Sequence, residues 1–189
     1  MDYQNYRDID LIDASLESNH VAFAELVSRY ESKVAGIVFS FLGKNSEAED
    51  IGQEVFIRFY ENLGKFRQES SVGTFLVRMA INASLNALKK IKHKKNLQDA
   101  WWEQQMLEQE HQKETPDEVA MKNRVQIAIR QLQLEFQTVV VLRIMEGYST
   151  KETAEILNIP VGTVLSRLSR AQKQLKDILS TPIKDAHSK

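Results

Sequence analysis

The chain has 189 residues, of which 42% are apolar and 27% are charged, with 7 glycines, 3 prolines and no cysteine. This length allows one or two small domains, and the scarcity of glycine and proline favours helices over an all-β fold. The lack of cysteine excludes disulfides, a thiol nucleophile and cysteine-bound zinc. The N-terminus is acidic without a long apolar run, so it does not predict a signal peptide, and no stretch approaches the roughly 20 apolar residues that span a bilayer.

A net charge of −1 hides four blocks of alternating sign. Residues 1–64 carry a net charge of −7, residues 65–95 of +7, residues 96–142 of −4 and residues 143–189 of +3. Two basic blocks separated by acidic ones are typical of a chain that contacts nucleic acid at two places. The acidic blocks would repel DNA and leave surface for a protein partner.

The first predicted helices are a short one over residues 9–16 and a long one over residues 22–42. Apolar side chains recur along the long segment at helical spacing, and Gly43 is expected to end it. These two segments begin an entirely helical N-terminal half.

A third helix is expected over residues 47–63, opened by a capping box of Ser46 and Glu49. Its spacing places one set of side chains on an outer side, namely Asp50, Gln53, Glu54, Ile57 and Glu61. Another side is apolar and consists of Ile51, Val55, Phe59 and Leu63. By itself, the acidic side is interpreted as an ordinary solvated face.

A fourth helix is expected over residues 71–92, after a short polar connection. Its predicted core residues are Phe75, Leu76, Met79 and Ala83. A polar stripe recurs at helical spacing along another side and consists of Arg78, Asn82, Asn86 and Lys89. The helix ends in the basic run K-K-I-K-H-K-K, which either binds phosphate or is a soluble helix end. Since Arg and Asn can also read base edges, the stripe favours a DNA contact.

Residues 96–115 are rich in Gln and Glu and are interpreted as an acidic linker. The adjacent Trp101 and Trp102 either dock on another protein or pack onto a neighbouring domain, and the sequence leaves both open. The linker ends in T-P-D-E, where Thr115 is the expected N-cap and Pro116 the first helical residue. A second helical domain is therefore expected to begin at this point.

The second domain is expected to open with helices over residues 117–132 and 135–146, the latter with V-V-V-L buried and ended by Gly147. Residues 150–179 then read as a helix-turn-helix with a basic second helix. Ala154 is small enough for two helices to cross closely, and Asn158 sits at the turn, where it tolerates positive φ.

The second helix of this motif combines one apolar seam with a basic face. The seam consists of Val164, Leu168, Ala171, Leu175 and Ile178. Off the seam lie Ser166, Arg167, Arg170, Lys173 and Lys176. Such a helix fits a major groove, where Arg reads guanine and Lys holds phosphate. The alternative is an ordinary amphipathic helix with a solvated face.

The predicted architecture is all-α, with two small helical domains joined by an acidic linker. The domains span residues 1–95 and 116–180, the linker spans 96–115, and residues 181–189 form a flexible tail. The four histidines are scattered without metal-ligand spacing, and neither a Gly-rich phosphate loop nor a nucleophile elbow is present. We therefore expect no metal, no cofactor, no small-molecule substrate and no enzymatic activity.

Two motifs taken together are specific for one family. Residues 48–56 read A-E-D-I-G-Q-E-V-F and are followed by S-S-V-G-T-F-L-V-R-M-A-I-N over residues 70–82. Residues 159–171 read I-P-V-G-T-V-L-S-R-L-S-R-A. The chain thereby resembles the extracytoplasmic-function (ECF) sigma factors of bacterial RNA polymerase, in their second and fourth conserved regions. A lone helix-turn-helix is a weak signal, whereas both motifs in this order are a strong one.

The resemblance implies partners for the first domain. In this family, one helix docks on the β′ clamp helices of core RNA polymerase. The residues that match it here are Asp50, Gln53, Glu54 and Phe56, so the resemblance implies that the acidic side binds polymerase. The β subunit is a second implied partner. The loop that captures an unpaired base of the −10 promoter element matches Phe66, Arg67 and Gln68, within the segment that runs to Ser71. The helix that contacts the same element at the point of melting matches Arg78, Asn82, Asn86 and Lys89.

For the second domain, the resemblance implies recognition of the −35 element. The matching residues are Val161, Thr163, Ser166, Arg167, Arg170 and Lys173. Three positions depart from the family pattern: Gln133 replaces a frequent Pro, Asn158 the usual Gly, and Leu165 a frequent Lys. The first two should be structurally mild, whereas Leu165 removes a charge near DNA.

The resulting hypothesis is a cytoplasmic, nucleoid-associated sigma factor that binds promoter DNA poorly until polymerase covers its acidic surface. The resemblance also implies an anti-sigma factor, because many family members are held inactive by one, often at the membrane. One alternative is a helix-turn-helix regulator that does not enter polymerase, but it predicts an α/β receiver domain where this sequence looks helical. A second alternative, a helical adaptor for protein alone, leaves the two basic blocks unexplained.

Overall fold

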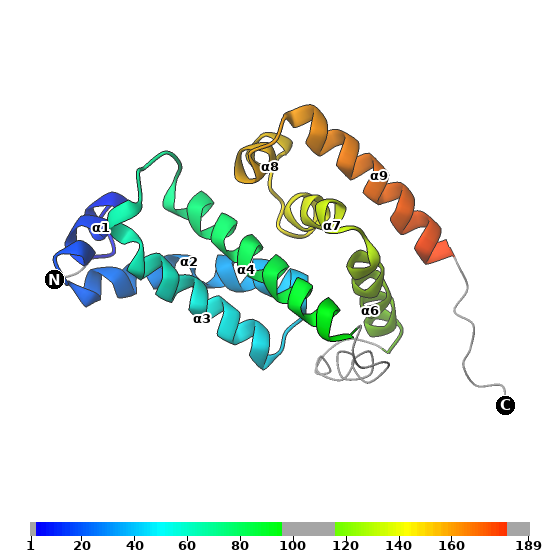
Figure 1. The fold of residues 1–189 in the computed structure, drawn as a ribbon, viewed down its shortest axis with the longest axis horizontal. Coiled ribbons are helices and arrows are strands. Elements are labelled where there is room, and N and C mark those ends of the chain that lie inside the picture. Colours follow the sequence, from blue (N-terminus) through cyan, green and yellow to red (C-terminus); the bar gives the residue numbers. More distant parts are fainter. Residues whose placement is uncertain (1–2, 96–115, 181–189) are drawn as a thin grey trace. The chain divides into compact units, whose positions relative to one another are not determined.

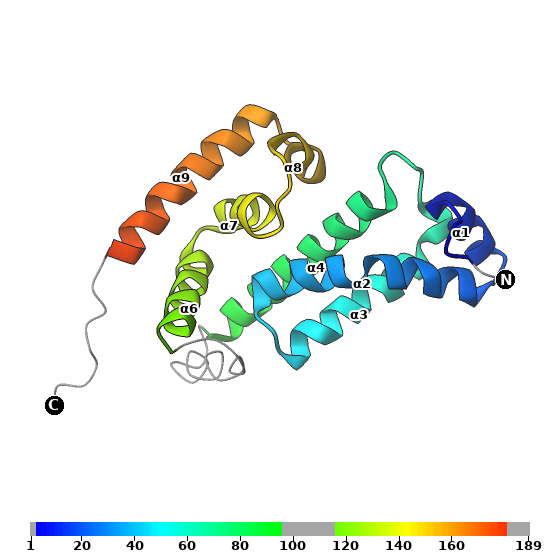
Figure 2. The same ribbon diagram turned by 180° about the vertical axis from the view of Figure 1, so that it is seen from behind.

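The computed structural model describes residues 3–95 and 116–180, and Figures 1 and 2 show these parts from opposite sides. Both ranges consist of helices and their connections, with no strand in either, so the all-α prediction is confirmed. The chain divides into two compact units, Met1–Asp99 and Ala100–Lys189. In the described ranges, no helix is long and apolar enough to cross a bilayer. The predicted linker with Trp101 and Trp102, the Thr115 cap and the tail lie outside the described residues.

The N-terminal unit is built around one long central helix. Its elements are α1 (Asp8–Leu16), α2 (His20–Leu42), α3 (Ser46–Glu61), the 3₁₀ turn η1 (Leu63–Lys65) and α4 (Val72–Lys95). Helix α2 packs against α1, α3 and α4, and α3 also packs against α4 (Figure 1). The fully buried side chains include Leu26, Ile37 and Phe41 of α2 and Phe59 of α3. The surfaces of α3 and α4 that face away from this core are therefore held on rigid elements.

Helix α4 is rotated relative to the sequence-based prediction. Leu76 is buried as expected, but Phe75 and Met79 are only half-buried, whereas Val77 and Ala80 are fully enclosed. The reason is that α4 packs against two helices, α2 and α3. Two partners bury a wider stripe of α4 than the single apolar row that its periodicity indicates.

The helix ends in this unit are set by Asn and Gly. The Asn19 side chain caps α2 by accepting hydrogen bonds from the backbone N–H groups of residues 21 and 22 at 3.1 and 3.2 Å. The Asn45 side chain caps α3, accepting from the Ala48 N–H at 2.9 Å. The predicted capping box at Ser46 is therefore wrong, because the cap lies one residue earlier and Ser46 is already helical. Gly43 ends α2 with φ of 79°, as predicted.

The C-terminal unit contains α6 (Pro116–Gln131), α7 (Leu134–Val140), the π turn η2 (Val141–Met145), α8 (Thr150–Leu157) and α9 (Val161–Ser180). Helix α9 packs against α6, α7 and α8. Val140, Val141 and Leu142 are almost fully buried, as the V-V-V-L prediction required. The seam prediction for α9 is also confirmed, since Val164 and Ala171 are buried and the remaining seam residues pack against the same clusters.

One predicted helix in this unit is two elements. The segment after α7 widens into a π turn, in which the Glu146 N–H donates to the Val141 carbonyl at 2.9 Å. The Arg143 guanidinium donates to the Tyr148 carbonyl across this turn. Gly147, with φ of 73°, then turns the chain toward α8.

The helix-turn-helix is closed by local hydrogen bonds. Ser149 and Glu152 form a reciprocal capping box at the start of α8, with distances of 3.1 and 2.7 Å, and sequence reasoning missed it. Asn158 ends α8 in the left-handed conformation, with φ of 51° and ψ of 49°, as predicted. The Ile159 N–H then donates to the Ala154 carbonyl at 3.1 Å, which holds α8 and α9 at a fixed turn.

Candidate functional site

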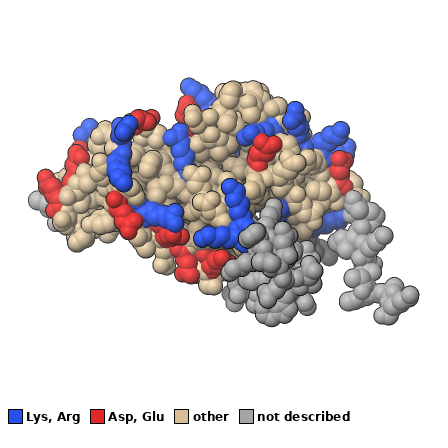
Figure 3. All heavy atoms as spheres, in the orientation of Figure 1, with Lys and Arg blue, Asp and Glu red and all other residues tan. Residues whose placement is uncertain are grey.

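The outer side of α3 presents acidic and amide groups to solvent. Asp50, Gln53 and Glu54 are all exposed, as the sequence predicted for this side. Glu54 accepts a hydrogen bond from Arg58 one turn later at 2.6 Å, but both side chains are about half exposed, so the pair contributes little stability. Acidic side chains also gather along the α3 edge of the N-terminal unit in Figure 3. This side therefore favours a basic partner.

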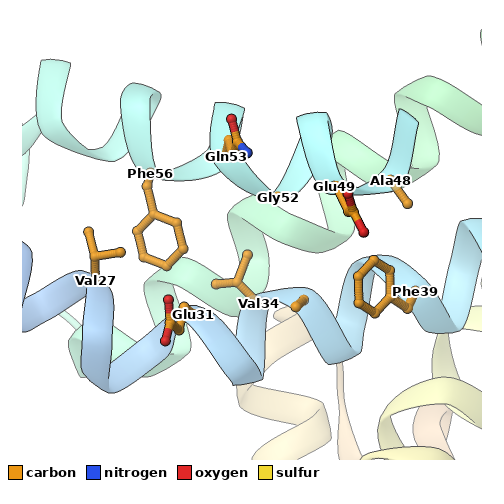
Figure 4. A pocket seen from close by; sticks show the side chains of 10 residues that line it. Val27, Glu31, Val34, Phe39, Ala48, Glu49, Gly52, Gln53 and Phe56 are labelled. Atoms are coloured by element: carbon orange, nitrogen blue, oxygen red, sulfur yellow. The ribbon is translucent and has the colours of Figure 1, made fainter. Parts of the chain in front are cut away.

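An apolar groove of about 210 Å³ lies beside this acidic side, between α2 and α3. Figure 4 shows Phe56 of α3 directed toward α2, near Val27 and Glu31. The middle of the groove is open because Gly52 has no side chain, and a Cβ there would meet no atom within 4 Å. Glu49 and Gln53 lie along the α3 edge of the groove. The arrangement suits an apolar side chain that is flanked by basic ones.

The predicted base-capturing loop contains one half-buried ring and two exposed side chains. The Phe66 ring packs edge-on against Phe75 at 5.3 Å and against Phe59 at 6.4 Å between ring centroids. Arg67 and Gln68 are exposed, and Gln68 adopts a positive φ of 56°. Non-glycine residues at positive φ carry strain and cluster at functional sites. Phe66 therefore anchors the loop to the core, and its two successors form the tip.

The polar stripe on α4 has the predicted geometry. Asn82, Asn86 and Lys89 are exposed on successive turns, and Arg78 is half-buried at the start of the stripe. The Ser71 hydroxyl accepts a hydrogen bond from the Thr74 N–H at 3.1 Å at the beginning of this helix. The loop tip and the stripe are thus joined through one capped turn and belong to one rigid unit.

The predicted −35 residues divide into two groups on α9. Exposed side chains belong to Val161, Ser166, Arg170 and Lys173, whereas those of Thr163 and Arg167 are half-buried. The Ser166 hydroxyl donates to the Thr163 carbonyl of its own helix at 3.0 Å. The exposed group is therefore the part of α9 that is immediately available to a ligand.

Arg167 is bound within the protein. Its guanidinium forms an ion pair with Glu135 of α7 at 2.8 Å, with 27% of the Arg167 side chain and 45% of the Glu135 side chain exposed. To read a guanine, Arg167 has to leave this carboxylate or share it. Sequence reasoning could not find Glu135, because it lies on a different helix and carries no motif signal. Arg170, which is exposed, is the more accessible candidate.

The N-terminus is fastened to α2 by one side chain that sequence reasoning missed. The Arg29 guanidinium donates to the Tyr3 and Gln4 carbonyls at 3.0 Å, to the Tyr6 carbonyl at 2.8 Å and to the Asp8 carboxylate at 2.9 Å. This clasp orders the segment ahead of α1.

The largest perturbation of a pKa in the described parts of the chain is next to this clasp. Burial, and then a hydrogen bond to Asp8, raise the pKa of Tyr30. Its ring faces Gly73 in the first turn of α4. The described residues contain no group of three or more His, Cys, Asp or Glu side chains that could hold a metal ion.

Comparison with known proteins identifies both units. The model of Sigma-70 region 2 matches residues 26–94, and that of Sigma-70 region 4 matches residues 122–175. The chain is 31% identical over 188 residues to the RNA polymerase sigma-H factor of Pseudomonas aeruginosa, covering 95% of this chain and 97% of that protein. It is 34% identical over 170 residues to the ECF RNA polymerase sigma factor SigW of Bacillus subtilis, covering 83% and 90%. The chain belongs to the ECF sigma factors.

Two solved structures of other proteins have a fold similar to that of this sigma factor. CnrH, in a complex with the cytosolic domain of CnrY, matches with a TM-score of 0.64 at 22% identity, covering 91% of this chain and 96% of that one. The sigma factor RpoE of Bartonella quintana, in a complex with the anti-sigma factor NepR, matches with a TM-score of 0.63 at 19% identity, covering 83% and 96%.

Membership in this family gives the chain its function. It is a sigma factor that directs promoter-specific transcription by RNA polymerase, as its resemblance to this family predicted. Family membership thereby excludes the alternative of a regulator that does not enter polymerase. The roles of individual side chains on α3, α4 and α9 remain predictions.

Proposed function

We propose that this sigma factor binds core RNA polymerase through α3, with the acidic side and the apolar groove acting together. The observation that carries the proposal is their adjacency: exposed Asp50 and Glu54 lie on the helix whose Phe56 lines the groove. Charge complementarity would steer a basic surface onto α3, and an apolar side chain entering the groove would hold it. The β′ clamp helices are the part of polymerase that fits this description, and the β subunit is a further contact.

The two DNA elements have separate sites in this proposal. Arg67 and Gln68 at the loop tip hold an unpaired base of the −10 element, and the stripe on α4 contacts the strand beside it. Helix α9 enters the major groove of the −35 element, as the second helix of such a motif does. Arg170 and Lys173 supply the immediately accessible basic groups, and Arg167 joins them by leaving or sharing Glu135.

Strand opening in this mechanism needs no catalytic side chain of the sigma factor. Removing a base from the stack costs a few kcal/mol, which the loop offsets by binding the base outside the duplex. Polymerase neutralises the acidic surface and sets the spacing between the two DNA-reading units. We therefore infer an initiation factor that is not itself an enzyme and that works in the cytoplasm, on the nucleoid.

An anti-sigma factor is the second protein partner that we propose. The RpoE relative of similar fold is held in a complex with the anti-sigma factor NepR. A protein that occupied the α3 groove would exclude polymerase by competition for the same residues. Such an inhibitor anchored in a membrane would keep this chain there until it was released.

Run-off transcription with purified core polymerase tests the proposal. We expect promoter-specific transcripts that depend on this chain. Changing both Asp50→Asn and Glu54→Gln should weaken association with core polymerase roughly tenfold, since two contacts of exposed charges, each worth up to about 1 kcal/mol, are lost. Gly52→Leu should fill the groove and have a similar effect while the chain stays folded, because the space there is open.

The matched control removes one exposed carboxylate from a different helix of the same unit, as Asp13→Asn on α1. This change should leave association with polymerase unaltered. An equal loss per removed carboxylate in the control and in the Asp50→Asn, Glu54→Gln variant would mean that total charge matters and that α3 is not the docking site. Full association of the Gly52→Leu variant would remove the groove from the proposal.

A further inference from the structure

The reading helix exposes two apolar side chains in its first two turns. Val161 is 46% exposed and Leu165 is 54% exposed, although the other apolar residues of this half of α9 are buried or packed against the core. Residues four apart share one face of a helix, so these two side chains are neighbours. A single exposed apolar residue needs no explanation, but an adjacent pair on a reading helix does.

The position of the pair places it at the edge of the DNA-facing side. Leu165 follows the buried Val164 and precedes the exposed Ser166, and successive residues are about 100° apart around a helix. Leu165 therefore lies between the core seam and the polar side of α9. The N-terminal turns of a recognition helix are those that meet base edges.

The charges of α9 favour DNA over a protein as the ligand of the pair. From residue 161 to residue 176, helix α9 carries four basic residues and no acidic one. These basic residues are Arg167, Arg170, Lys173 and Lys176. The pair lies at the N-terminal end of a helix whose charged side chains are all basic as far as residue 176, so this part of α9 carries no charge that opposes a phosphate-bearing groove.

The chemistry of the groove limits what the pair can recognise. Neither side chain forms hydrogen bonds, so neither can read the donor and acceptor groups of a base. The one apolar feature of a base pair in the major groove is the C5-methyl group of thymine. A methyl group held against Leu165 would also be removed from water, which adds affinity in proportion to the apolar area buried.

We propose that Leu165, supported by Val161, recognises the methyl group of a thymine in the upstream promoter element. The inference rests on the proposed function of α9 as the −35 reading helix. Leu165 would then determine specificity without a charge. The expected result is a preference for a T·A pair beside the bases that polar side chains read.

The experiment uses the polymerase holoenzyme formed with the full chain. A randomised upstream duplex is first selected for binding, and each thymine of the selected element is then replaced singly by deoxyuridine, which lacks only the methyl group. We expect the wild type to lose affinity about fourfold at one thymine, or at two adjacent ones, the effect of one buried methyl group. Leu165→Ala should bind the selected element more weakly and lose this sensitivity.

Two further variants make the result specific. Leu165→Lys should also lose the sensitivity to deoxyuridine, while gaining a steeper salt dependence from an added phosphate contact. Ile144→Ala removes a side chain that is 56% exposed outside α9 and should retain the full sensitivity. Both positions are exposed, so the variants are expected to fold, and circular dichroism checks this.

The proposal is overturned if no deoxyuridine affects the wild type, or if Leu165→Ala keeps the same sensitive thymine. It is also overturned if Leu165→Ala leaves the thymine scan unchanged but weakens association with core polymerase, because the pair then belongs to a protein interface. If the holoenzyme selects no upstream sequence at all, the role of α9 as the reading helix fails together with this inference. Selection of an element without any methyl effect refutes the inference alone.

Discussion

The ion pair between Arg167 and Glu135 provides a direct test of how the reading helix is prepared for DNA. We predict that Glu135→Gln tightens binding of the holoenzyme to its cognate upstream element. In the proposed reading of the −35 element, the Arg167 guanidinium, which the carboxylate holds at 2.8 Å, has to exchange this partner for a base. An amide in place of the carboxylate releases the guanidinium without removing bulk from the contact.

The structure limits the size of this effect. Glu135 is 45% exposed and Arg167 is 27% exposed, so water screens the pair, and pairs of this kind contribute about 0–1 kcal/mol. A bidentate contact between Arg and guanine discriminates by about 1–3 kcal/mol. The pair is therefore too weak to prevent reading, and Glu135→Gln should improve affinity by up to about fivefold. The unfolding free energy should fall by less than about 1 kcal/mol.

The assay is a double-mutant cycle on cognate and scrambled upstream duplexes. Arg167→Ala should weaken cognate binding more than scrambled binding. In the Arg167→Ala background, Glu135→Gln should give little further change, because the competitor has lost its partner. A gain from Glu135→Gln that is equal on both duplexes would reflect only the removal of a negative charge near phosphate.

A loss of cognate binding in the Glu135→Gln variant, in place of the expected gain, would refute this prediction. If Glu135→Gln weakened cognate binding as much as Arg167→Ala does, Glu135 would orient Arg167 toward the base and would not compete with it. A loss in unfolding free energy well above 1 kcal/mol would mean that the pair is mainly structural.

Four further predictions concern the scaffold and can be measured by urea or thermal unfolding. Gly73→Ala should lower the unfolding free energy by about 1–2 kcal/mol, since its Cβ would lie 2.9 Å from the Tyr30 ring, a cost that exceeds the gain in helix propensity; an increase would contradict this. Asn158→Gly should be nearly neutral and Asn158→Val should cost about 1–2 kcal/mol, because φ is 51° at the turn; equal effects would show that the turn is not strained. Gln137→Met should raise the unfolding free energy by about 1 kcal/mol, since the buried Gln137 Nε2 has no hydrogen-bond partner among the described residues; a loss would indicate a partner. Burial and the Asp8 contact raise the pKa of Tyr30 from its ordinary 10.0, so the stability from its neutral form is complete below pH 10.0 and is lost as the pH rises above it; Tyr30→Phe should reduce this alkaline loss, and an unchanged profile would refute the assignment.

Local sequence determined the helices, the turn of the helix-turn-helix and the family. Helical periodicity and turn residues act within a few positions of each other, so Asn158 at the turn and the buried seam of α9 could be predicted without a fold. The family was predicted from two motifs, because motif residues and their spacing are properties of the chain itself. The cap of α3 was missed by one residue, since Asn45 and Ser46 are both good caps and only the backbone conformation distinguishes them.

Only the tertiary structure decided which predicted site residues are free to act. The partner of Arg167 lies on another helix, and the groove beside Phe56 exists because α2 and α3 leave open space over Gly52. The ring of Phe66 packs against the rings of Phe59 and Phe75, which belong to two different helices. Contacts of this kind depend on how the helices are packed, and helical periodicity contains no information about the partner that each face will meet.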